Sequence, residues 1–159
     1  MGMFSGMNQA EPGGSRPYIQ PGKFVFKVHA NKMIESKKKR GQYYFIGELE
    51  VLESSDSNFP AGLMMSYSRN MANGGYPELA LAEIRQYLHV CINSMQASLG
   101  EEPVSLEDIV EETAETAVGE DNPLKGVIIA CHAWRKDPAD KDSWINKEFS
   151  VPENLQDFL

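Results

Sequence analysis

The chain has 159 residues, of which 15 are Lys or Arg and 23 are Asp or Glu, so its formal net charge is −8. Its 42% of hydrophobic and 24% of charged residues are proportions of a globular protein, and no apolar run approaches the about 20 residues of a membrane-spanning helix. Cys91 and Cys131 lie inside apolar patterns, which predicts buried free thiols in a reducing compartment, the cytoplasm. Composition therefore argues against a membrane protein and against a secreted, disulfide-stabilised one.

The net charge hides a division into a basic part and an acidic part. Residues 16–44 contain eight Lys or Arg and one acid, Glu35, whereas residues 101–121 contain nine Asp or Glu and no Lys or Arg. Because local potential governs binding, the basic part is expected to attract a polyanion although the whole molecule is acidic.

The first part of the chain predicts an arm and three strands. Residues 1–22 are rich in Gly and Pro, which predicts a flexible N-terminal arm. Residues 23–35 and 42–53 alternate apolar and polar side chains, as half-buried strands do. The block Lys37-Lys38-Lys39-Arg40-Gly41 is expected to join them as a hairpin tip, with Gly41 at positive φ. Residues 63–68 predict the third strand.

Two helices are predicted next. Pro77 suits the first position of a helix and Gly100 suits its C-terminal end, and the apolar residues between them repeat at helical spacing. Residues 105–118 predict a shorter acidic helix, with Leu106 and Val110 among the side chains expected to face inward.

The fold class follows from the order of the elements. Residues 124–135 and 143–151 predict two further strands, and residues 152–159 a tail. Three strands, a helical insert at about 77–118 and two strands give a mainly β protein of the α+β type. This is the order of a five-stranded oligonucleotide-binding (OB) barrel, with its helices between strands 3 and 4. We expect residues 23–151 to form that domain.

Cations beside aromatic residues on a sheet favour single-stranded nucleic acid, because cations hold phosphates and rings stack on bases. Tyr43 and Phe45 are expected in the core, which leaves Tyr44 on the opposite face as a stacking candidate. The competing interpretations are a solvated loop for the basic block and ordinary packing for the tryptophans. The candidate binding residues are Lys27, Lys32, Lys37, Lys38, Lys39, Arg40, Tyr44, Tyr67, Arg69, Trp134 and Trp144.

Patterns typical of catalysis or metal binding do not occur in the sequence. His29, His89 and His132 lack the mutual spacing of a metal site, and His89 is expected at the surface. The acidic stretch at 101–121 lacks the alternating Asp, Asn and Gly of a calcium loop, and no P-loop or catalytic triad is present. We therefore expect a protein that is not an enzyme and that uses no cofactor and no metal.

Several segments carry a resemblance to a known family. The motif PGxFxFKV begins at Pro21, YYFIGELEVLESS at Tyr43, PAG at Pro60 and NPLKGVIIACHAW at Asn122. Together the motifs and the last strand span Pro21 to Val151, and they resemble phage-encoded OB-fold proteins that bind single-stranded DNA. The resemblance implies sequence-tolerant DNA binding during phage replication or recombination, in the cytoplasm of the host cell. It is also compatible with a homo-oligomer.

The tail adds a second resemblance. Single-stranded-DNA-binding proteins often end in an acidic tail with an aromatic residue, which recruits replication enzymes. Asp157, Phe158 and Leu159 form a short version of such a tail, which implies replication or recombination proteins as partners.

Two other functions stay open at this stage. The acidic helix is compatible with an OB-like interaction module that recruits or inhibits another protein without DNA binding. The Gly- and Met-rich arm is compatible with a structural component of a virion.

Overall fold

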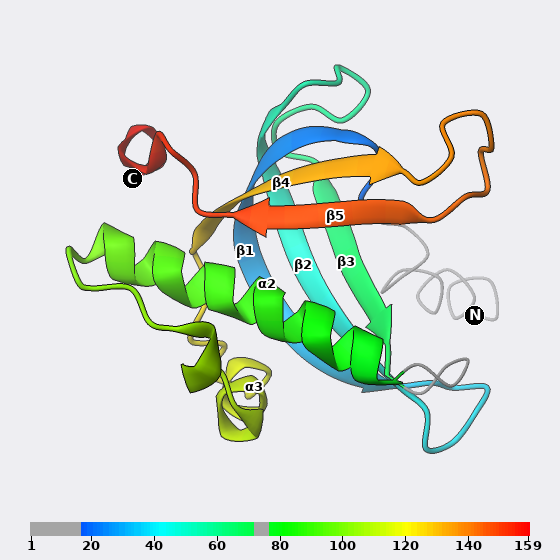
Figure 1. Ribbon diagram of the computed structural model, residues 1–159, viewed down its shortest axis with the longest axis horizontal. Helices are drawn as coiled ribbons and strands as arrows, with labels where there is room; N and C mark the ends of the chain where they lie inside the picture. Colours follow the sequence, from blue (N-terminus) through cyan, green and yellow to red (C-terminus); the bar gives the residue numbers. More distant parts are fainter. Residues whose placement is uncertain (1–16, 72–76) are drawn as a thin grey trace, which may run out of the picture.

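The computed structural model of the chain describes residues 17–71 and 77–159, and its centre is a five-stranded antiparallel sheet (Figure 1). The strands pair in the order β3-β2-β1-β4-β5, so that β3 and β5 are its two outer strands. This confirms a mainly β fold with the helical insert between the third and fourth strands. The strands are β1 (Gly22–Glu35), β2 (Tyr43–Ser54), β3 (Met64–Asn70), β4 (Ile128–Arg135) and β5 (Ile145–Ser150).

The long helix α2 (Pro77–Ser98) lies across one face of the sheet (Figure 1). Its buried side chains Ile84, Leu88 and Cys91 join the main hydrophobic core. Two hydrogen bonds tie the helix to the strands: Tyr87 Oη donates to Asn31 Oδ1 at 2.8 Å, and Ser94 Oγ donates to the carbonyl oxygen of Ile128. Apolar burial and these bonds together fix α2 against the sheet.

The predicted acidic helix is two pieces, the 3-10 turn η2 (Leu106–Asp108) and the helix α3 (Glu111–Ala117). Ile109 between them is buried, and its carbonyl oxygen accepts a hydrogen bond from Arg85 Nε of α2 at 2.8 Å. Val110 is extended, with φ −117° and ψ 179°. The expectation that Leu106 and Val110 face inward is wrong, because burying Ile109 turns both toward solvent.

The alternation of core-facing and outward-facing side chains along β1 shifts by one residue between Val28 and Ala30. The pairing of β1 with β2 is irregular at this point. Beyond that point Asn31 takes the core side, where it lies opposite Gly47 of β2 and bonds Tyr87. A Cβ on Gly47 would lie 2.9 Å from Tyr87 Oη, so this position needs a residue without a side chain. The sheet, the helix and a buried polar pair therefore meet at Gly47.

Some side chains differ from the sequence-based expectations. Tyr43, expected in the core, is exposed, because the hairpin carrying it extends beyond the packed part of the sheet. His89, expected at the surface, is half-buried, and its Nε2 lies 2.8 Å from the carbonyl oxygen of Val104. Gly41 has the expected positive φ, at 82°.

Both ends of the described chain pack against the sheet. Residues 1–16 of the predicted arm lie outside the described residues, but Ile19 is buried and its N–H donates to the carbonyl oxygen of Ser66 in β3. At the other end, η3 (Leu155–Phe158) packs Leu155 against Val25 and Ile128. Residues 17–20 and the tail are therefore parts of the folded unit. None of the described helices is long and apolar enough to cross a membrane.

Candidate functional site

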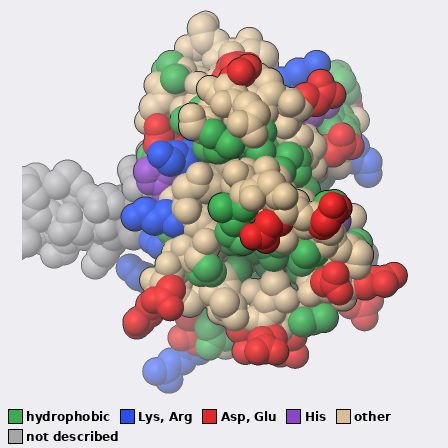
Figure 2. Space-filling model, turned by 90° about the vertical axis from the view of Figure 1, so that its left-hand side faces the viewer, with side chains coloured by type: hydrophobic (Ala, Val, Ile, Leu, Met, Phe, Trp, Pro, Cys, Tyr) green, Lys and Arg blue, Asp and Glu red, His purple; other side chains and the backbone are tan. Residues whose placement is uncertain are grey.

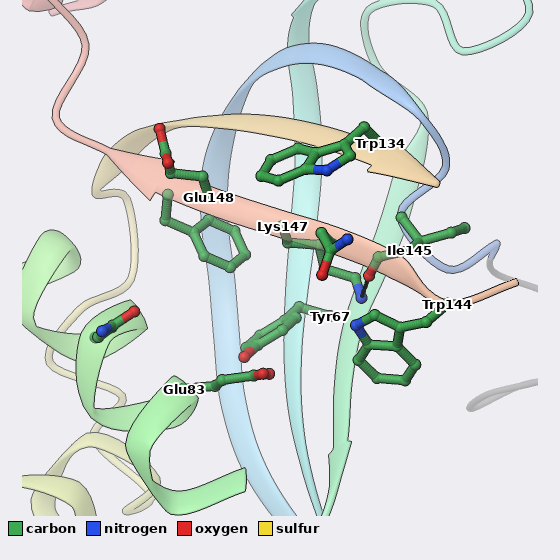
Figure 3. A pocket seen from close by; sticks show the side chains of 10 residues that line it. Tyr67, Glu83, Trp134, Trp144, Ile145, Lys147 and Glu148 are labelled. Atoms are coloured by element: carbon green, nitrogen blue, oxygen red, sulfur yellow. Dashed lines mark hydrogen bonds between the residues drawn. The ribbon is translucent and has the colours of Figure 1, made fainter. Parts of the chain in front are cut away.

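A cleft lies between the outer strands β3 and β5, and we name it the β3–β5 cleft. Its larger hollow has a volume of about 790 Å³ and is lined by residues from both strands, the start of α2, residues 18–20 and the loop before β5. A smaller hollow of about 240 Å³ adjoins it around β5 (Figure 3). The two hollows share Glu83, Trp144, Ile145 and Lys147. The larger volume is typical of a ligand-binding cleft.

Two cations meet one aromatic ring in this cleft. Arg69 Cζ of β3 lies 4.9 Å from the centre of the Trp144 ring, and Lys147 Nζ of β5 lies 4.7 Å from the same ring. These distances are within the range of cation–π attraction. Trp144 nevertheless keeps 50% of its surface exposed. The cleft therefore presents an accessible indole with positive charge beside it.

Strand alternation explains how these cations come to the cleft. Arg69 follows the core residues Met65 and Tyr67 at every second position of β3, and it is 8% exposed. Lys147 stands in the same way between Ile145 and Phe149 of β5. Burial, and then the charge of Arg69, lower the pKa of Lys147, while the carboxylate of Glu83 acts in the opposite direction.

Glu83 of α2 is the negatively charged partner of Arg69. Its Oε2 lies 3.1 Å from Arg69 Nε, an ion-pair distance that lacks the alignment of a hydrogen bond. Figure 3 shows Glu83 projecting from the helix toward the strands, next to Tyr67. The helix thus places a carboxylate at the floor of the cleft.

Tyr67 is a core residue and not a stacking platform. It is 2% exposed, and its ring lies 5.0 Å from the rings of both Tyr87 and Phe149. Burial raises the pKa of its hydroxyl far above the ordinary value. A base has no access to the Tyr67 ring, so we remove this residue from the candidate set.

Tyr44 lines the larger hollow, at the end nearest the β1–β2 hairpin. Tyr18, which the sequence pattern did not indicate, lines the same hollow and is largely exposed. The cleft thus joins the predicted candidates Tyr44, Arg69 and Trp144 with the unpredicted Tyr18 and Lys147. Exposed tyrosine and tryptophan rings are suitable for stacking on flat ligands.

The predicted basic hairpin is confirmed as a structure. Lys37, Lys38, Lys39 and Arg40 are all exposed in the turn between β1 and β2 (Figure 1). The carboxylate of Glu35 accepts a hydrogen bond from the N–H of Gly41 at 2.9 Å, which fixes the turn from inside. Tyr44 follows this turn closely in β2 and is the residue of the cleft lining that is nearest to the tip in sequence, whereas none of the four cations lines the cleft.

Two further lysines lie on the outer face of the sheet, beside acids. Lys32 Nζ donates to Glu48 Oε1 at 2.6 Å. Lys27 stands opposite Glu50 in the pairing of β1 with β2, and Glu50 Oε1 lies 2.7 Å from His29 Nε2. Since neighbouring carboxylates offset their charge, Lys27 and Lys32 present less positive charge to solvent than the hairpin lysines do.

The structure separates the two tryptophans. Trp134 and Trp144 lie on opposite sides of β5, and Trp134 packs against His132 with ring centres 5.1 Å apart (Figure 3). The two rings therefore do not form one platform. Trp134 is exposed and lines the smaller hollow, as Trp144 also does, so it stays a candidate on the other side of β5.

A second surface is apolar and acidic. Two grooves border α3. The first, of about 400 Å³, lies between α3 and α2, and the second, of about 370 Å³, lies between α3, α2 and the turn before β4. Leu81 and Val110 at the first groove are 51% and 53% exposed. On the face that Figure 2 shows, acidic side chains gather in the lower half, with hydrophobic side chains among them. Within the described ranges, no group of three or more His, Cys, Asp or Glu side chains is placed to hold a metal ion.

Neither a model of any protein family nor any curated protein matches this chain.

Proposed function

We propose that this protein binds single-stranded DNA without sequence preference and without catalysis, in phage replication or recombination. The observation that carries this proposal is the β3–β5 cleft, where Arg69 and Lys147 lie within 5 Å of the exposed Trp144 ring. Tyr44 and Tyr18 extend the aromatic lining toward the cationic hairpin tip. Phosphates and bases of one strand find complementary groups along this path.

The chemistry favours a single strand over a duplex. Stacking of a base on an aromatic side chain contributes about 1–3 kcal/mol, and it tolerates any sequence because every base has a π-face. In a duplex the base faces are stacked on one another and are not free for Trp144. Cations at the hairpin tip then add a salt-dependent attraction to the phosphates.

The proposed fold is an OB-like barrel, and two features support it. The strand order β3-β2-β1-β4-β5 puts β3 and β5 at the positions that would meet on closure of a five-stranded barrel. Tyr67 of β3 and Phe149 of β5 have ring centres 5.0 Å apart, so side chains bridge these strands. OB barrels bind oligonucleotides near the loops that join strands 1–2 and 4–5. The hairpin tip and Trp144 lie in or next to those loops.

Recruitment of replication or recombination proteins through the tail remains part of the proposal. Asp157 and Leu159 are exposed, whereas Phe158 is half-buried against the cluster around Leu155. A partner that recognises Phe158 would have to release it from this cluster first.

The direct test is the anisotropy of a fluorescent oligo-dT during titration with the protein at low salt, alongside a hairpin duplex of equal length. We expect the single strand to bind, and to bind more tightly than the duplex. Absence of binding to oligo-dT at low salt, in anisotropy and in gel mobility, would sink the proposal.

The second candidate is a protein-interaction module without a DNA role. The exposed Leu81 and Val110, next to acidic residues of η2 and α3, favour it, since exposed apolar side chains with a polar rim are typical of docking surfaces. In that case substitutions at Glu107, Glu111 and Glu115 abolish activity, and charge reversal at the hairpin tip leaves it intact.

A further inference from the structure

The ion pair of Arg69 with Glu83 is geometrically imperfect. Arg69 is buried, so its charge needs a partner, yet Glu83 Oε2 lies 3.1 Å from its Nε without hydrogen-bond alignment. A guanidinium offers five N–H donors in a planar fork that matches carboxylate and phosphate oxygens two at a time. Glu83 therefore uses only a small part of what Arg69 offers.

Charged side chains of both signs lie in the cleft around Arg69. Lys147 shares the Trp144 ring with Arg69, and its charged neighbours are Arg69 and Glu83. Asp142 lines the same cleft, but it is not among the groups that influence Lys147. The larger hollow is lined by the carboxylates of Glu83 and Asp142, and of these two Glu83 is the one that pairs with Arg69. Glu148 lines the adjoining smaller hollow. Burial, and then the charge of Arg69, lower the pKa of Lys147, and the carboxylate of Glu83 acts in the opposite direction.

We infer that Arg69 and Lys147 form a subsite for one phosphate of the bound strand, and that the carboxylate of Glu83 holds this place in the free protein. A phosphodiester brings one negative charge and oxygens that suit the guanidinium better than a single carboxylate oxygen does. It would lie between the two cations, with the neighbouring base against Trp144.

Exchange of Glu83 for phosphate makes Glu83 an internal competitor of the strand. The side chain of Glu83 is 35% exposed, so it has space to turn away from Arg69 toward solvent. The protein avoids an unpaired buried guanidinium in either state. Affinity is lower than the two cations alone would provide, because binding must first displace Glu83. This inference rests on the proposed binding of single-stranded DNA and adds a defined subsite to it.

The test compares Glu83→Gln with Glu78→Gln, by titration of fluorescent oligo-dT at low salt. Both substitutions remove one negative charge from α2, but Glu78 is exposed in its first turn and does not line the cleft. We expect Glu83→Gln to tighten binding by about threefold to tenfold and Glu78→Gln to change it by less than about twofold. Equal effects of the two substitutions would overturn the subsite.

A double-mutant cycle shows whether Glu83 acts through Arg69. In an Arg69→Gln background, Glu83→Gln is expected to lose its advantage; a gain that persists there contradicts the inference. Glu83→Ala provides a second variant with the same expected direction, should the glutamine variant not fold. If the wild-type protein binds oligo-dT and Glu83→Gln gains nothing, the subsite fails alone. If neither the wild-type protein nor any variant binds oligo-dT, the subsite and the proposed function are both contradicted.

Discussion

Lys147 is a residue of the cleft that the sequence pattern did not predict. In the sequence it is one lysine within a short strand, without neighbouring cations. Its proposed role comes from sharing the Trp144 ring with Arg69, a residue from a distant part of the chain. The available signal was its place between Ile145 and Phe149, because a cation on an apolar strand face must have a polar surrounding.

The charge of Lys147 should contribute to the salt dependence of DNA binding. If Lys147 contacts one phosphate, Lys147→Gln weakens oligo-dT binding and reduces the salt-dependence slope by about 0.7, the value for one phosphate of a single strand. Binding isotherms at several salt concentrations measure the slope. Lys125→Gln is the matched control, because Lys125 is exposed in the turn before β4 and lies outside the cleft. Identical slopes for the two variants would contradict the role of Lys147.

The position of Gly47 leaves no space for a side chain. A Cβ at this position would lie 2.9 Å from Tyr87 Oη and 3.3 Å from Asn31 Oδ1, where the sheet and α2 meet. Because a packed interior does not accept an extra methyl group without displacement, Gly47→Ala should lower the free energy of unfolding by about 1–3 kcal/mol. Urea denaturation measures this change. An unchanged unfolding midpoint would mean that α2 does not pack on β2 in this way.

At the scale of elements, local patterns predicted strands and turns well. The hairpin tip lies at residues 36–42 with Gly41 at positive φ, and α2 begins at the expected Pro77. The shorter helix was predicted less well. Its break around Ile109 comes from burial against α2 and from the bond to Arg85, and neither interaction is visible in the spacing of residues 105–118.

The element-scale prediction separates the two candidate functions. Replacing Lys37, Lys38, Lys39 and Arg40 with Gln should weaken oligo-dT binding and lower its salt slope by about 0.7 for each phosphate that the hairpin tip no longer neutralises. All four side chains are exposed, so the fold should not change. The control replaces Glu107, Glu111 and Glu115 with Gln, which should leave DNA binding intact. Oligo-dT binding that is insensitive to the hairpin substitutions would contradict a role of the hairpin tip, whereas absence of oligo-dT binding by the unaltered protein would favour the interaction module.

At the level of the whole molecule, the antiparallel sheet of five strands confirms the mainly β, α+β class that the element order predicted, while the OB-like barrel stays a prediction. The relation between β3 and β5 was not predictable in the same way, because it depends on how far the sheet curves and on residues 17–19 at the edge of β3. The cleft occupies this region. Three of the predicted site residues meet there, while Tyr67 lies in the core and Trp134 on the other side of β5.

The same scale explains how an acidic protein would bind a polyanion. The cationic hairpin tip and the acids of α3 belong to different elements, and salt reduces long-range interaction between them beyond about 10 Å. DNA binding is therefore expected to depend on the local potential of the cleft and hairpin, and not on the net charge of −8.

In the proposed complex, a base of the bound strand stacks on Trp144. The chain has two tryptophans, so Trp134→Phe leaves Trp144 as the only tryptophan, and Trp144→Phe leaves only Trp134. The decisive measurement is the tryptophan fluorescence of both variants during titration with oligo-dT at low salt. We predict strong quenching in the Trp134→Phe protein and weaker binding by the Trp144→Phe protein. Unchanged Trp144 fluorescence at saturating oligo-dT would contradict stacking on this ring.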